Sequence, residues 1–68
     1  MSVYRVIELV GTSELSWDDA AKSAIETAGK HLRELRIGEV TKLDLKIEDG
    51  KLLYRVRLNL SFKYTGEA

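Results

Sequence analysis

The sequence predicts one α+β domain with the element order β-α-β-β, which we expect to span residues 1–68. Three observations predict this class. A run rich in β-branched residues opens the chain, an apolar stripe at helical spacing follows it, and two alternating runs then flank an Asp-Gly dipeptide.

The first strand is expected over Val3–Val10. Both of its faces are largely apolar, with Arg5 and Glu8 as the interruptions. A strand that is apolar on both faces is usually buried on both. Because one helix covers only one face, the pattern indicates contacts with another subunit. The strand is expected to end at the Gly-Thr-Ser sequence of residues 11–13.

A single helix is predicted from the N-cap Ser16 to about Leu35, with Asp19 at the reciprocal capping position and Gly38 as the stop. One stripe of this helix is apolar and mostly alanine in its middle, so the helix can lie close to a sheet. The stripe comprises Trp17, Ala20, Ala21, Ala24, Ile25, Ala28, Leu32 and Leu35.

The second and third strands are predicted over Glu39–Glu48 and Leu52–Tyr64, joined by a tight turn at Asp49 and Gly50. One register satisfies both alternating patterns. On the apolar face it pairs Ile47 with Leu52, Leu45 with Tyr54, Leu43 with Val56, and Thr41 with Leu58. On the polar face it pairs Asp44 with Arg55 and Lys42 with Arg57.

These elements predict a three-stranded antiparallel sheet of order 1-3-2 wrapped on one helix. The third strand is long for such a small domain. Thirteen residues span roughly 44 Å, whereas a compact chain of this length is about 25 Å across. One end of the strand is therefore expected to leave its own subunit and pack on a second one.

Composition excludes several function classes. The chain has 11 basic and 11 acidic residues, and this balance argues against a nucleic-acid partner. No apolar stretch approaches a membrane span, and Met1-Ser2 leads directly into a strand pattern rather than a signal peptide. The absence of cysteine is compatible with a reducing compartment, and we expect a cytoplasmic protein.

No catalytic constellation is visible, so we predict that the protein is not an enzyme. The chain lacks a cysteine nucleophile, a glycine-rich phosphate loop and a supportable Ser-His-Asp set. His31 has no second metal ligand at helical spacing. The corner at Glu48 and Asp49 lacks the alternating oxygen ligands of a calcium loop, and a turn explains it fully. Metal ligands are therefore not identified.

Four segments together resemble the dodecins, small bacterial and archaeal proteins of β-α-β-β fold. They are VYRVIELVGTS, SWDDAA, LRELRIGEV and YRVRLNLSFKY, and the resemblance covers residues 3 to 64. It implies a hollow homododecamer of cubic symmetry that stores or quenches flavin, with isoalloxazine rings stacked between tryptophans at a two-fold interface. Some members of the family also carry coenzyme A.

Two departures from the flavin-binding pattern affect the expected ligand. Where flavin-binding dodecins have a tryptophan after the helix this chain has Ile37, and where they have a glutamine in the last strand it has Arg55. Isoleucine offers no ring stacking, and arginine donates hydrogen bonds but accepts none. Binding of riboflavin or FMN is therefore expected to be weak. Ser16-Trp17 and Ile37 resemble a second branch that includes a calcium-binding dodecin.

The hypothesis is a non-enzymatic shell that binds flavin, FMN or coenzyme A type ligands between subunits, with calcium binding or a purely structural assembly as alternatives. The candidate ligand-binding residues are Ile37, Arg55, Arg57, Lys63 and Trp17. Each also has a simpler explanation. Trp17 fits core or interface packing, and the basic residues fit a solvated strand face that could grip phosphates.

Overall fold

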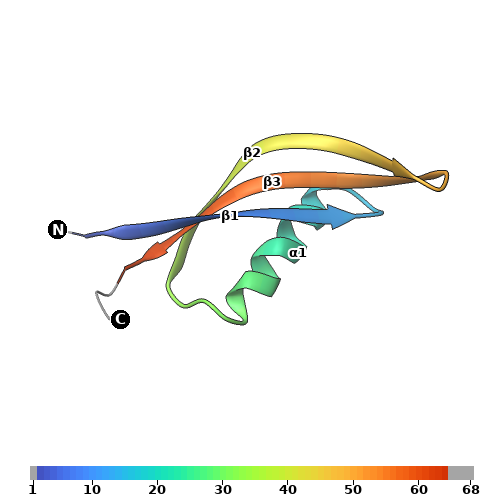
Figure 1. Cartoon of the computed structure of the whole chain (residues 1–68). Helices are drawn as coiled ribbons and strands as arrows, with labels where there is room; N and C mark the ends of the chain where they lie inside the picture. Colours follow the sequence, from blue (N-terminus) through green and yellow to red (C-terminus); the bar gives the residue numbers. More distant parts are fainter. Residues whose placement is uncertain (1, 65–68) are drawn as a thin grey trace.

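The fold has the predicted class and strand order. The structure is a computed structural model that describes residues 2–64; residues 1 and 65–68, which the expected domain includes, lie outside the described residues. Its elements are β1 (Tyr4–Ser13), α1 (Trp17–Gly29), β2 (Leu35–Glu48) and β3 (Lys51–Lys63). The strands form one antiparallel sheet of order β1-β3-β2, and α1 lies across one face of it (Figure 1). No described helix is long and apolar enough to cross a membrane.

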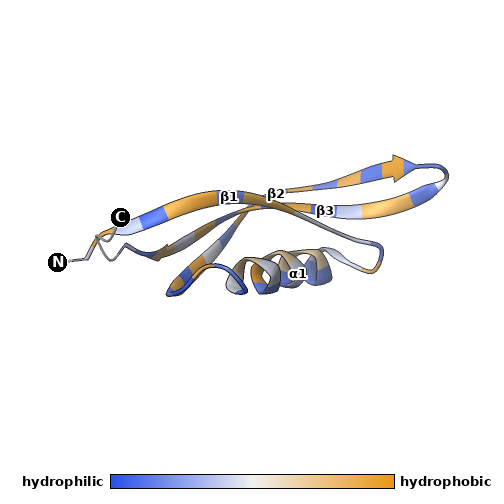
Figure 2. Cartoon of the chain, turned by 60° about the horizontal axis from the view of Figure 1, so that its bottom comes forward, coloured by the Kyte–Doolittle hydropathy of each residue, from blue (hydrophilic) through white to orange (hydrophobic). Residues whose placement is uncertain are grey.

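The sheet is much longer than the helix that covers it. The molecule measures 48 × 21 × 18 Å, so the expected overhang of the long strand is confirmed. The β2–β3 hairpin extends past one end of α1, and the start of β1 and the end of β3 lie past the other end (Figures 1 and 2). Within residues 2–64, no second layer covers either overhang (Figures 1 and 2).

The core lies at the middle of β3, where the strand crosses α1. Val56, Leu58 and Leu60 are at most 2% exposed, and Ala20 contacts them from the helix. Even-numbered residues of β3 therefore face α1, as the alternation predicted. Partly buried apolar residues surround this cluster, namely Ile7, Leu9, Trp17, Ala21, Ala24, Ala28 and Leu35.

The first strand does not end at Gly11 as predicted. It continues to Ser13, with Gly11 paired to Val56. A Cβ at Gly11 would lie 2.3 Å from the carbonyl oxygen of Ala20, so only glycine lets β1 pass this close to the helix. The glycine is thus a packing requirement and not a strand terminator.

The predicted extension of the helix to Leu35 is wrong. The helix ends at Gly29. Glycine is the weakest helix former after proline, and the chain contains no proline. The chain then turns, with the carbonyl of Ala28 accepting from two following backbone amides and Glu34 at a φ of 61°. Residues of the predicted helix end instead begin β2, because Leu35 pairs with Phe62.

The predicted hairpin register holds near the turn and fails further from it. The Ile47–Leu52, Leu45–Tyr54, Leu43–Val56, Asp44–Arg55 and Lys42–Arg57 pairs are all confirmed. The Thr41–Leu58 pair is wrong, because a register shift between Val40 and Lys42 places Val40 opposite Leu58. Thr41 is the extra residue, and its hydroxyl donates to the carbonyl of Arg57 (3.1 Å).

Candidate functional site

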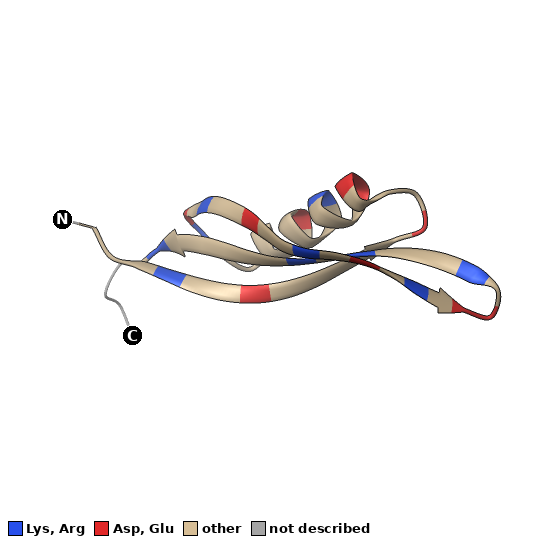
Figure 3. Cartoon of the chain, turned by 90° about the horizontal axis from the view of Figure 1, so that it is seen from above, with Lys and Arg blue, Asp and Glu red and all other residues tan. Residues whose placement is uncertain are grey.

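The candidate site is the sheet face opposite α1, which we call the outer face. Charged residues of both signs are spaced along the three strands (Figure 3). The strand register defines four rows across it. They are Val6–Ser61–Ile37, Glu8–Asn59–Glu39, Val10–Arg57–Lys42 and Thr12–Arg55–Asp44. An acidic row thus lies beside a basic row, and both are open to solvent in this chain.

The structure places four of the five predicted residues on the outer face. Arg55, Arg57 and Lys63 are odd-numbered residues of β3 and point away from the buried even-numbered ones. Ile37 joins them because it pairs with Ser61, and it is 66% exposed. Trp17 lies on α1, on the opposite side of the sheet. It is partly buried against the core, which agrees with the packing interpretation.

The four outer-face residues do not converge within one chain. Ile37 is level with Ser61, six positions along β3 from Arg55, which is roughly 20 Å at about 3.4 Å per residue. Lys63 is two positions beyond Ser61, at the end of the strand. A small ligand that touched both Ile37 and Arg55 would therefore have to take them from different subunits.

Arg55 is already engaged by Asp44. Its Nε and Nη2 donate to the two carboxylate oxygens at 2.7 and 2.9 Å, a bidentate ion pair. These hydrogen bonds from Arg55 hold the pKa of Asp44 below its ordinary value, and the same bonds raise the pKa of Arg55. Both groups are charged at neutral pH, and the pair leaves Arg55 with fewer free donors for a ligand.

Trp17 contacts the backbone of the same aspartate from the helix side. Its indole Nε1 donates to the carbonyl oxygen of Asp44 at 3.1 Å. The ring meets Tyr54 edge-on, with centroids 5.2 Å apart and an interplanar angle of 81°. Asp44 therefore connects the helix to the outer face: its main chain holds Trp17 and its side chain holds Arg55.

Arg57 and Lys42 form a basic row of the outer face, beside the row that contains the Asp44–Arg55 ion pair. The ion pairs of residues 2–64 involve Arg36 with Glu34, Lys46 with Glu48 and Arg55 with Asp44, and neither Arg57 nor Lys42 belongs to them. The two cations face each other across β2 and β3. Side by side they repel one another. The carboxylate of Asp44 in the next row attracts both of them, and an anion placed between them would relieve the repulsion further.

The described residues do not gather a metal site within one chain. Among residues 2–64 no group of three or more His, Cys, Asp or Glu side chains is arranged to hold a metal ion. Glu14, Glu48 and Asp49 line an open cleft at the hairpin tip, beside Lys51, without forming such a group. Residues 2–64 of one chain therefore show no cluster of three carboxylate or imidazole side chains for a calcium ion.

Sequence reasoning missed two parts of this site. Lys42 and Asp44 were placed correctly by the hairpin register, but they were not counted among the ligand-binding residues. The register itself was the available signal, since it puts both side chains in the rows of Arg55 and Arg57. The contact between Trp17 and the Asp44 carbonyl has no sequence signal, because it depends on how the helix is docked.

Comparison with known proteins agrees with the fold. The family model described as Dodecin matches residues 3–65. The calcium dodecin of Mycobacterium tuberculosis is 41% identical over 64 residues, which cover 93% of this chain and 90% of that protein. Its crystal structure has a TM-score of 0.87 at 37% identity, covering 98% and 97% of the two chains. The dodecin of Streptomyces coelicolor has a TM-score of 0.89 at 39% identity, covering 97% and 96%.

Proposed function

The chain belongs to the dodecin family, and on that premise we propose that it forms a non-enzymatic homododecameric shell. In this proposal each chain is one domain over residues 1–68, and the shell binds small ligands between its subunits. Its unpartnered apolar surface supports the assembly. The two overhanging ends of the sheet carry exposed side chains that include Val3, Tyr4 and Tyr64 at one end and Ile47 at the other. Surface of this kind marks contacts with other chains. We also propose a cytoplasmic location in a bacterial or archaeal host, with no nucleic-acid or membrane partner.

The ligand class we propose is an anion-bearing nucleotide of the FMN or coenzyme A type. The observation that carries this proposal is the row of Arg57 and Lys42, two cations without an ion-pair partner among residues 2–64. A guanidinium beside an ammonium group suits a phosphate, which accepts from both. Lys63 lies on the same face and would contribute from the end of β3.

Flavin rings fit this face poorly. Ile37 presents a branched aliphatic side chain where a stacking ring would be needed. Two N–H donors of Arg55 are already hydrogen-bonded to Asp44, and the side chain has no acceptor for the flavin pyrimidine edge. Riboflavin, which has no phosphate, is therefore expected to bind far more weakly than FMN or coenzyme A.

The test compares Arg57→Ala with the matched variant Arg33→Ala, since Arg33 is also exposed but lies in the turn after α1. Calorimetry with FMN and with riboflavin separates phosphate binding from ring binding. Arg57→Ala should weaken FMN about tenfold or more and flatten its salt dependence, while Arg33→Ala should not. If the parent and Arg57→Ala bind FMN and coenzyme A equally well, or if neither binds, the row is a solvated face and the assembly is purely structural.

A second experiment tests the assignment of the ring site. The double variant Ile37→Trp with Arg55→Gln should increase quenching of riboflavin fluorescence, because each stacked ring pair contributes about 0.5–1.5 kcal/mol beyond burial. Unchanged quenching would show that these positions do not meet at an interface. Native mass spectrometry of protein purified from its own host would report the subunit number and the bound ligand together.

Calcium is a second candidate ligand, favoured by the similarity to a relative that is named a calcium dodecin. Because residues 2–64 assemble no three-ligand group, the ligands would come from neighbouring subunits, and calcium binding should require assembly. Calorimetry with calcium, and with magnesium as the control, should show calcium binding to the assembled protein only. Equal heats with both ions, or none, would remove calcium as a specific ligand.

A further inference from the structure

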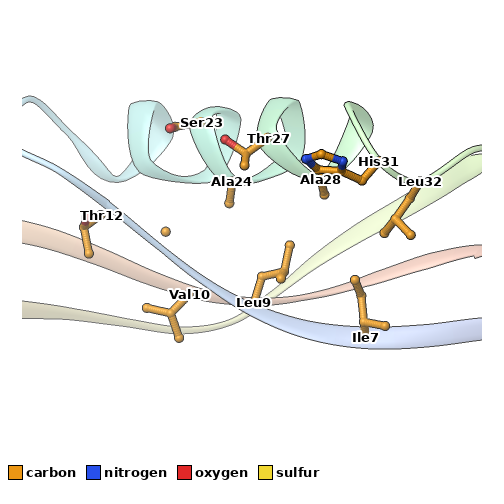
Figure 4. A pocket seen from close by; sticks show the side chains of 11 residues that line it. Ile7, Leu9, Val10, Thr12, Ser23, Ala24, Thr27, Ala28, His31 and Leu32 are labelled. Atoms are coloured by element: carbon orange, nitrogen blue, oxygen red, sulfur yellow. The ribbon is translucent and has the colours of Figure 1, made fainter.

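The groove between α1 and β1 offers no lysine or arginine to an anionic ligand. It has a volume of about 410 Å³ and lies along β1, which is an edge strand of the sheet (Figure 4). Leu9, Ala24, Ala28 and Leu32 are among the residues that line it, and none of its described lining residues is Lys, Arg, Asp or Glu. Contacts with a phosphate are therefore left to the outer face, where charges of both signs lie in adjacent rows.

Four charged residues of the outer face form a group that we call the quartet. Arg55 lies opposite Asp44 in one row, and Arg57 lies opposite Lys42 in the next row. The two rows are two residues apart along each strand, which is roughly 7 Å at about 3.4 Å per residue. Three cations thus share the neighbourhood of a single carboxylate, and the quartet has an excess of positive charge.

Asp44 interacts with all three cations of the quartet. It accepts hydrogen bonds from Arg55 at 2.7 and 2.9 Å, and these bonds are the main cause of its lowered pKa. Lys42 and Arg57 attract the same carboxylate and lower its pKa further. The side chains of Arg55 and Asp44 are 38% and 31% exposed, so a ligand can reach the pair from solvent. A phosphate would compete for the same donors, because carboxylate and phosphate oxygens both suit the fork of a guanidinium group.

From this arrangement we propose that Asp44 is a specificity-determining residue, whose carboxylate occupies the Arg55 donors that a ligand phosphate would otherwise bind. In the parent protein a phosphate is held by Arg57 and Lys42 and meets a resident negative charge beside them. Asp44 therefore limits the affinity of the outer face for phosphorylated ligands. This inference rests on the proposed function and adds the residue that opposes anion binding at that site.

Calorimetry with FMN tests the proposal on Asp44→Asn, which keeps the shape of the side chain and removes its charge. FMN should bind this variant about tenfold more tightly than the parent, with a steeper salt dependence, because Arg55 becomes free for the phosphate. Riboflavin, which has no phosphate, should bind the parent and the variant alike. A half-exposed ion pair contributes little to stability, so Asp44→Asn should assemble as the parent does. Asp44→Ser serves as a second neutral variant and should show the same gain.

The matched control is Glu48→Gln. Glu48 lies on the same strand and the same face as Asp44, and it pairs with Lys46 at 3.6 Å. The control therefore removes the same charge and releases a cation without touching the quartet. Its affinity for FMN should stay within about twofold of the parent, because salt screens charges at this separation.

A double variant tests the part played by Arg55. Asp44→Asn combined with Arg55→Ala returns the quartet to the net charge of the parent but removes the donors that Asp44 had occupied. It should bind FMN no more tightly than the parent does.

Three results would overturn the proposal. FMN could bind the neutral variants of Asp44 no more tightly than the parent. Glu48→Gln could strengthen binding as much as Asp44→Asn, which would make overall charge the cause. The gain could persist in the double variant, which would show that Arg55 does not hold the phosphate. Equal FMN binding by the parent and Arg57→Ala is a different outcome, because it would contradict the proposed anion site itself.

Discussion

Substituting Gly11 with alanine should separate β1 from α1. The added Cβ would lie 2.3 Å from the Ala20 carbonyl oxygen and 3.0 Å from the Ala24 Cβ. Ordinary contact begins near 3.4 Å, so the strand and helix would have to part by about 1.1 Å. Both nearest obstacles belong to the helix, and neither can rotate away. Overpacking of this kind costs about 1–3 kcal/mol, a large share of the roughly 3–5 kcal/mol that a core of this size supplies.

Gly29→Ala is the matched control because it adds the same methyl group. At Gly29 the added Cβ would meet only the Leu35 Cδ1 at 3.8 Å, an ordinary contact, and the residue is helical. The substitution should be neutral or stabilising by up to about 1 kcal/mol. Urea unfolding followed by circular dichroism, at one protein concentration, should show a lower midpoint for Gly11→Ala and an unchanged or higher midpoint for Gly29→Ala. A Gly11→Ala midpoint equal to that of the parent would refute the close-approach argument.

Three further predictions concern the core and Asp44. Leu58→Ala should cost about 2–5 kcal/mol, since Leu58 is fully buried, and should leave little folded protein by calorimetry. Trp17→Phe keeps a ring beside Tyr54 but loses the hydrogen bond to the Asp44 carbonyl, so urea unfolding should show a free energy of unfolding lower by about 0.5–1.5 kcal/mol. An unfolding midpoint equal to that of the parent would contradict a stabilising role for this hydrogen bond. The pKa of Asp44 is lowered from 3.8, so its ion pair should stabilise the fold fully above pH 3.8 and progressively less below it. The difference in the free energy of unfolding between the parent and Asp44→Asn should therefore stay constant from pH 8 to 5 and shrink only below pH 3.8. A difference that shrinks above pH 5 would contradict the Asp44–Arg55 ion pair.

The elements and the strand order could be predicted because local and periodic signals agree. The alternation of β3 and the Asp49-Gly50 turn together define the hairpin, and both glycine and aspartate adopt positive φ there as the turn requires. Boundaries were less predictable. Gly11 and Gly38 are residues that commonly interrupt helices and strands, but here both lie within strands. At Gly11 the helix backbone comes too close for a larger residue, and at Gly38 the side chains of Ile25 and Leu60 leave little room.

The candidate site could be predicted only in part, for a physical reason. Strand alternation assigns Arg55, Arg57 and Lys63 to one face without any tertiary information. Alternation alone does not give the distance from these residues to Ile37, because the register shift at Thr41 changes which residues of β2 lie opposite β3. The groove beside β1 is also invisible in the sequence, since it depends on the helix ending at Gly29.

The double engagement of Asp44 gives the protein a built-in optical probe. Trp17 is the sole tryptophan of the chain, and its indole is bonded to the main chain of the residue whose side chain holds Arg55. An event on the outer face that draws Arg55 away would shift Asp44 and change the polarity around the indole on the far side of the sheet. Tryptophan emission would then follow binding in unlabelled protein, even for a ligand that is itself colourless.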